Sequence, residues 1–168
     1  VSIGDYAFAR CIPAKDDLDD EFNSPYGLKQ FQIGKNVESI GKSAFENLSA
    51  LKKVTLPDGL ESIGEGAFYK CEKLTNIKLP DSVTEIGGWA FSWCSSLSEV
   101  ETPENLKTLG DCAFQGCTSL ESIYLSDVVS HMANTVFKEC GDDLSIICPE
   151  GSYAETYAKD NGIKVEND

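Results

Sequence analysis

The chain has 168 residues, of which 41% are hydrophobic, so it is long and apolar enough to bury one continuous core. It carries 14 basic and 28 acidic residues, for a formal net charge of −14. Such a charge repels phosphate backbones and anionic lipids, and the sequence has no apolar run of the length that crosses a bilayer. We therefore expect neither nucleic acid binding nor membrane insertion, and a basic or neutral partner is favoured.

A six-residue phrase that ends in phenylalanine recurs along the chain. Its copies are Ile3–Phe8, Ile40–Phe45, Ile63–Phe68, Ile86–Phe91, Leu109–Phe114 and Met132–Phe137. From the second copy onward the phenylalanines follow at intervals of 23 residues, whereas Phe8 and Phe45 are 37 residues apart. A fixed period of this length is typical of a solenoid, in which each unit buries its apolar face by stacking on copies of itself.

Between these phrases apolar and polar residues alternate, as around Val54 and Leu56, which predicts a short strand with one buried face. Proline follows in several copies and ends the strand, because it has no N–H to donate. A second apolar pair then follows a turn in each copy. These pairs are Leu60/Ile63, Val83/Ile86, Leu106/Leu109 and Val128/Met132.

The copy from Leu74 to Cys94 reads LTNIKLPDSVTEIGGWAFSWC and resembles the BspA-like, or Treponema pallidum-type, leucine-rich repeats. The resemblance implies an α/β repeat solenoid, a right-handed coil of about six 23-residue repeats with short parallel strands on one face. It also implies a curved scaffold for binding, usually on a cell surface. We expect the array to cover residues 1–147 and a C-terminal cap to cover residues 148–168.

The long first interval indicates an insertion over residues 12–27, which is polar, acidic and bounded by Pro and Gly. We expect it to form a surface loop on one coil. Its acidic run, Asp16–Glu21, is interpreted as a solvated charge run. Calcium binding is the alternative, although the run lacks the spacing and central glycine of an EF-hand loop.

The C-terminal segment carries helix signals. Ser152 followed by Glu155 predicts a capping box, and Gly162 after Asn161 predicts the end of a short helix over residues 152–161. Residues 163–165 are expected to return as a strand, so that helix and strand cover the end of the stack. The chain begins within a repeat and without a leader, which indicates a mature or excised part of a longer secreted or cell-surface protein.

Cysteines recur three residues after the repeat phenylalanine, in the position that Leu48 fills in one copy. They are Cys11, Cys71, Cys94, Cys117 and Cys140. A position that accepts Leu or Cys is a small apolar core position, so these are predicted to be buried thiols. A disulfide among Cys112, Cys117 and Cys148 stays open.

The chain shows no catalytic or metal-binding pattern. His131 is its one histidine, it has no CxxC pair, and it carries no nucleophile motif such as GxSxG. The carboxylates are scattered over exposed repeat positions. We predict a protein that is not an enzyme and that uses no metal or other cofactor.

Two sets of residues are candidate ligand-binding positions. Strand residues that flank the buried ones should form two exposed columns. The column residues are Lys53, Thr55, Asn76, Lys78, Glu99, Glu101, Ser122 and Tyr124. The second candidate is Trp89 with Trp93, whose rings would lie side by side if their turn were helical. Packing of one ring over the neighbouring turn is the alternative.

These observations predict a non-catalytic protein-binding or adhesion module of a secreted or cell-surface bacterial protein, with an extracellular protein or a glycan as its ligand. The variable columns on an invariant core support this prediction. The alternative is a structural spacer or a self-association module that stacks through its N-terminal edge.

Overall fold

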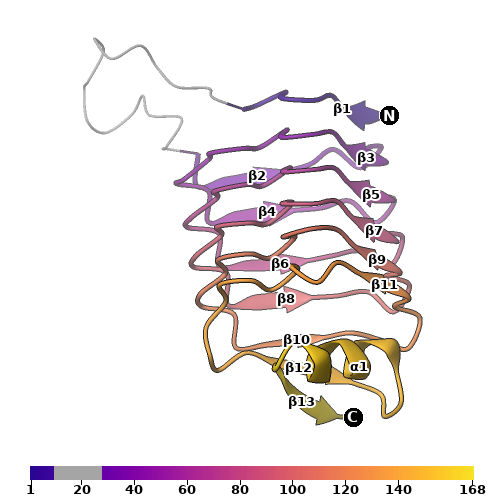
Figure 1. Cartoon of the computed structure of the whole chain (residues 1–168). Coiled ribbons are helices and arrows are strands. Elements are labelled where there is room, and N and C mark those ends of the chain that lie inside the picture. The colour runs from indigo at the N-terminus through magenta and orange to yellow at the C-terminus, as the bar shows by residue number, and fades with distance from the viewer. Residues whose placement is uncertain (10–27) are drawn as a thin grey trace.

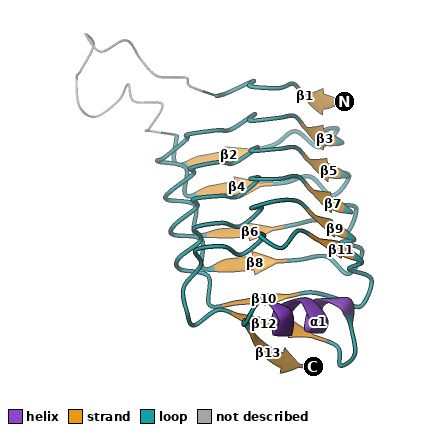
Figure 2. Ribbon diagram, in the orientation of Figure 1, coloured by secondary structure: helices purple, strands orange, loops and turns teal. Residues whose placement is uncertain are grey.

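The computed structural model describes residues 1–9 and 28–168, and the predicted insertion over residues 12–27 lies outside the described residues. The described chain is a solenoid of stacked coils, as the 23-residue period predicted (Figure 1). Every strand pairing in it is parallel. One helix, α1 (Tyr153–Asp160), is present among the described residues, and it lies at the C-terminal end (Figure 2).

Each coil places strands on two of its sides. The longer strands are β2 (Gln30–Gln32), β4 (Lys53–Thr55), β6 (Asn76–Lys78), β8 (Glu99–Glu101), β10 (Ser122–Tyr124), β12 (Ser145–Cys148) and β13 (Lys164–Asn167). The two-residue strands are β1 (Ser2–Ile3), β3 (Ser39–Ile40), β5 (Ser62–Ile63), β7 (Glu85–Ile86), β9 (Thr108–Leu109) and β11 (His131–Met132). The second column was not predicted as strands, although its apolar pairs were. We call the solvent side of the longer strands the strand face.

The third side of each coil, which we call the turn side, consists of residues 4–9, 41–48, 64–71, 87–94, 110–117 and 133–140. Its backbone bonds from coil to coil, as where Phe68 N–H donates to the carbonyl of Ala90 at 2.7 Å. The phenylalanines point inward from this side and stack at 5.1 Å between Phe45 and Phe68 and 5.3 Å between Phe68 and Phe91. Neighbouring coils are therefore held at the same spacing on all three sides.

A glycine column fixes how closely the coils approach. A Cβ on Gly87 would lie 2.7 Å from the backbone nitrogen of Glu65, so the repeat needs glycine here for close approach. The last coil has Ala133 instead. There the N–H of Ala133 reaches the Leu109 carbonyl at 3.2 Å, against 2.8 Å from Gly87 to Ile63. The ring centroids of Phe114 and Phe137 are correspondingly 5.8 Å apart.

The column of longer strands is interrupted once, between β8 and β10. In three other coils a backbone N–H after the strand bonds to the next coil, as from Leu79 to the Glu101 carbonyl at 2.9 Å. At this position Thr102 replaces leucine, and its hydroxyl donates to the carbonyl of Tyr124. The Thr102 hydroxyl thus donates to the carbonyl that would otherwise accept the backbone N–H, as the Glu101 carbonyl does from Leu79.

The C-terminal cap agrees with its sequence signals. The hydroxyl of Ser152 accepts a hydrogen bond from Glu155 N–H at 3.2 Å, and the Glu155 carboxylate accepts from Gly151 N–H at 2.9 Å. Tyr157 packs its edge on Phe137, with centroids 6.4 Å apart. β13 pairs with β12, whose Ser145–Cys148 span crosses the predicted boundary between array and cap.

One assignment within the array was wrong. Val128 was expected to fill the apolar position of the second pair, but it is 41% exposed, whereas Val129 is buried. Counting 23 residues from Leu106 gives Val129, so the period identifies the buried valine. Within the described part of the chain, no helix has the length and apolarity needed to span a membrane.

Candidate functional site

The predicted columns lie on the strand face. In β4, β6 and β8 the middle residue is buried and its two neighbours are exposed, which gives the expected alternation. The register places Asn76 opposite Glu99 and Lys78 opposite Glu101. Ser122 in β10 is exposed and Tyr124 is half-buried. The structure therefore brings all eight residues onto one face, in neighbouring coils.

A hollow of about 320 Å³ opens on this face where β4 and β6 pair least. Pairing between these strands is confined to Lys53 opposite Asn76. Five column residues line the hollow together with apolar and turn residues of the two coils. The complete lining is Lys53, Val54, Thr55, Leu56, Asp58, Asn76, Lys78, Pro80 and Glu101.

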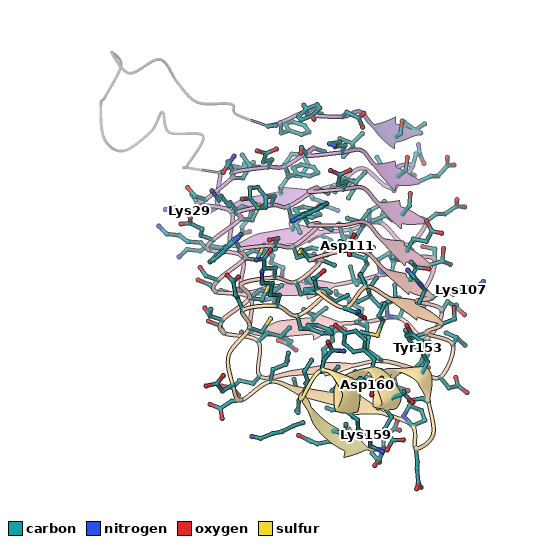
Figure 3. All side chains as sticks on the ribbon, viewed as in Figure 1. Lys29, Lys107, Asp111, Tyr153, Lys159 and Asp160 are labelled. Atoms are coloured by element: carbon teal, nitrogen blue, oxygen red, sulfur yellow. The ribbon has the colours of Figure 1, made fainter. Side chains whose placement is uncertain are left out.

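Ionic groups are distributed unevenly along the array as a whole. Residues 28–80 contain eight lysines and six carboxylates, for a net charge of +2, whereas residues 81–168 contain four lysines and 16 carboxylates, for a net charge of −12. The exposed residues Lys29, Lys52 and Lys53 stand at the N-terminal end of the face, where Figure 3 shows Lys29 at its edge. Glu99 and Glu101 lie on β8, farther toward the C-terminal end of the same face. On the strand face itself the ionic column residues change from Lys53 and Lys78 to Glu99 and Glu101, so this face is bipolar.

The two halves meet at an ion pair. Lys78 Nζ lies 2.7 Å from Glu101 Oε2, and both side chains are largely exposed. Beyond it, partial burial and the nearby carboxylates of Glu104 and Asp168 raise the pKa of Tyr124, so its phenol is a hydrogen-bond donor at neutral pH. The face thus offers ammonium, carboxylate, amide and phenol groups within a few coils.

Trp89 and Trp93 lie on the turn side, 41% and 38% exposed. Their turn is not helical, because both residues have left-handed backbone conformations with φ of 55° and 61°. The condition for side-by-side rings is therefore not met. Trp93 packs over the next coil, where a Cβ on Gly116 would meet its ring at 2.8 Å. Trp89 instead lines a recess with residues of earlier coils.

Three of the repeat cysteines are buried thiols, as predicted, whereas Cys140 is only half-buried. Cys71, Cys94 and Cys117 are fully buried, and desolvation raises the pKa of each, to about 12 for Cys71. All cysteines among residues 28–168 are free, including Cys112 and Cys148, so no disulfide forms there; Cys11 lies outside the described residues. Buried neutral thiols are poor nucleophiles.

His131 is exposed on β11 opposite Thr108. The nearby Asp111 carboxylate accepts a hydrogen bond from the Thr135 hydroxyl at 3.4 Å. No cluster of three or more His, Cys, Asp or Glu side chains suited to a metal ion occurs within the described ranges. The acidic run Asp16–Glu21, with its calcium alternative, falls outside them.

Comparison with known proteins agrees with this architecture. The family model for the BspA type leucine rich repeat region matches residues 18–142 in six copies. A comparison with curated proteins found no match. Among solved structures, the pneumococcal vaccine antigen PcpA is similar with a TM-score of 0.66 and 26% identity over 73% of this chain and 31% of that chain.

Two further structures are similar over more of this chain. A leucine rich cell surface protein from Faecalibacterium prausnitzii has a TM-score of 0.61 and 28% identity over 88% of this chain and 43% of that chain. The leucine rich repeat protein of T. pallidum has a TM-score of 0.59 and 26% identity over 83% of this chain and 73% of that chain. This chain therefore spans less than half of two of these relatives. With the family model matched over more than half of its length, the chain belongs to the BspA-type leucine-rich repeat family.

Proposed function

We propose that this chain is a non-catalytic protein-binding or adhesion module of a secreted or cell-surface bacterial protein, and that its ligand sits on the strand face. The observation that carries the proposal is the hollow between β4 and β6, which opens among the column residues at the junction of the two charged halves. A rigid solenoid with varied exposed residues is suited to an extended binding surface. The similarity to a leucine rich cell surface protein supports the location.

The charge distribution defines the partner that fits. An acidic stretch of the partner would lie over Lys29, Lys52 and Lys53, and a basic stretch would lie over Glu99 and Glu101. Because these side chains are exposed, such binding should weaken with salt, as the Debye length falls from about 30 Å at 0.01 M to about 8 Å at 0.15 M.

The test is a binding screen of the folded chain against arrayed extracellular proteins and glycans. A partner on the strand face should lose at least about tenfold in affinity to Lys53→Glu with Lys78→Glu, and similarly to Glu99→Lys with Glu101→Lys. Lys107→Glu is the matched control, because Lys107 lies on the edge opposite Lys29 (Figure 3). All variants should stay within about 4 °C of the wild-type melting temperature, because the exposed ion pair that the double substitutions break contributes little.

Two outcomes would contradict the proposal. A partner whose affinity survives both double substitutions does not use this face. If no partner is found and light scattering shows assembly that grows with concentration, the self-association alternative is favoured instead. If a glycan binds and both double substitutions abolish that binding, the strand face remains the site and the ligand is a glycan instead of a protein.

A further inference from the structure

On the turn side, equivalent residues of successive coils form a column, and in one such column a single position is glycine. The residues of this column share a positive φ, between 51° and 61°, and all but one carry a side chain. They are Tyr6, Ser43, Gly66, Trp89 and Cys112. A Cβ on Gly66 would meet only the Ser43 hydroxyl oxygen at 3.2 Å and Tyr69 Cβ at 3.8 Å. The absent side chain leaves the buried backbone of Gly66 as the floor between Ser43 and Trp89.

The result is a shallow recess of about 260 Å³. Its walls come from three successive coils and combine two aromatic rings with two carboxylates. The complete lining is Ser43, Glu46, Glu65, Gly66, Tyr69 and Trp89. A second glycine of the turn side, Gly116, forms no comparable opening, because the ring of Trp93 covers it.

The lining has no basic residue and carries two formal negative charges. The protein's own lysines contact it from outside: Lys42 Nζ lies 2.8 Å from Glu65 Oε1, and Lys70 Nζ lies 5.2 Å from the centre of the Tyr69 ring. Glu46 uses Oε1 to accept from Asn47 at 3.1 Å. The second oxygen of each carboxylate can accept a further donor, and the indole of Trp89 is the ring that cations prefer.

We propose that this recess binds a side-chain cation of a partner protein, with an arginine guanidinium placed against Trp89 and hydrogen-bonded to Glu46 and Glu65. A planar guanidinium can stack on an indole and donate in parallel to a carboxylate, which a single ammonium cannot do. The recess lies on the turn side, so this proposal goes beyond the strand-face function and can fail or hold without it.

The test uses the ¹⁵N-labelled chain and the peptide acetyl-Gly-Arg-Gly-amide as the probe. The chain has two tryptophans, so its spectrum has two indole N–H signals to follow. The Trp89 signal should shift saturably while the Trp93 signal stays in place. The citrulline analogue has nearly the same shape but no charge, and it should bind at least about fivefold more weakly.

Variants separate the parts of the site. Glu46→Gln with Glu65→Gln should lower the affinity for the arginine peptide by about fivefold or more. Gly66→Ser should abolish the shift by filling the floor, and its backbone is compatible because Ser43 and Cys112 occupy the same position in other coils. Trp93→Phe is the control and should leave binding unchanged. The remaining amide signals report whether each variant is folded.

Several results would overturn the proposal. Equal binding of the citrulline analogue would show that charge is not recognised. A saturable Trp89 shift with methyl glucoside, but not with the arginine peptide, would assign the recess to a neutral sugar. Absence of any saturable shift, or equal shifts of both indole signals, would show that the recess has no specific affinity for a guanidinium.

Discussion

The thiol of Cys94 donates a hydrogen bond to the backbone carbonyl of Phe68, with 3.3 Å between sulfur and oxygen. Cys71 and Cys117 make the same bond to Phe45 and Phe91, at 3.3 and 3.2 Å. Each thiol therefore fills a small apolar core position and also gives a buried carbonyl of the preceding coil a second hydrogen bond, beside one from a backbone N–H such as that of Cys71 to Phe68 at 3.1 Å. Leucine can do only the first of these, which gives cysteine a physical advantage in this column.

We predict that burial of these thiols makes the protein sensitive to alkaline pH. Desolvation raises the pKa of Cys71 from 9.0 to about 12, so the folded state favours the neutral thiol. The contribution is fully present below pH 9 and is lost as pH rises toward 12, because the thiol of the unfolded chain ionises first. The loss for this group is at most roughly 4 kcal/mol.

Urea unfolding from pH 7 to 11 under reducing conditions measures this loss. Cys71→Ala should cost about 1–2 kcal/mol at pH 7. The difference between this variant and the wild type should then narrow above pH 9. Cys112→Ala is the control, because Cys112 is only half-buried. A constant difference up to pH 11 would contradict the assigned role of burial.

Gly87→Ala should be strongly destabilising, because the new Cβ would meet the backbone of the preceding coil at 2.7 Å. A cost above about 2 kcal/mol is expected, since neither backbone can move without disturbing the stack. Gly59→Ala is the matched control, as nothing lies within 4 Å of its added Cβ. Urea denaturation of both variants checks this, and equal effects would show that close approach is not what requires glycine.

Much of this fold could be predicted because each position of the repeat has the same place and the same burial in every coil. Alternation around Val54 and Ile77 predicts the strands and their buried side, and a constant period predicts the register. The Cys/Leu exchange at Leu48 predicted burial, but it could not show that the thiol donates to a carbonyl. Val128 was misassigned because two adjacent valines are equally apolar and only the period distinguishes them.

The sites were less predictable, because each depends on a departure from the repeat. The hollow arises where pairing of β4 with β6 is reduced, and no residue type in either strand indicates it. The recess arises from Gly66, whose neighbours in the column carry side chains. Left-handed conformations were also missed at Trp89 and Trp93, although Gly66 and Gly116 in the same columns are residues that favour them.

The ion pair between Lys78 and Glu101 should contribute little to stability, although its atoms are 2.7 Å apart. Both side chains are exposed, and such pairs typically contribute about 0.2–1 kcal/mol. A double-mutant cycle with Lys78→Gln and Glu101→Gln, measured by urea unfolding at low and high salt, should give a coupling energy in this range that falls with salt. A coupling above about 2 kcal/mol would mean that strand-face variants also disturb folding.

The C-terminal cap should open first under acid. Hydrogen bonds from Lys159 and from the Gly151 N–H lower the pKa of Glu155, so its contribution is present at neutral pH and is lost as pH falls through its folded pKa, below 4.5. Ser152→Ala removes the other half of the cap and should cost about 1 kcal/mol. Both changes loosen α1, which covers Phe137 through Tyr157.

Hydrogen exchange with mass spectrometry can localise this opening. In Ser152→Ala, exchange should rise in residues 153–160 and in residues 133–140 beneath them, and should stay unchanged in residues 53–78, because each coil contacts only its neighbours. Asp160→Ala is the control, as Asp160 is exposed on the same helix and lies away from the cap residues. Faster exchange throughout the array would show instead that the cap and all coils unfold as one unit.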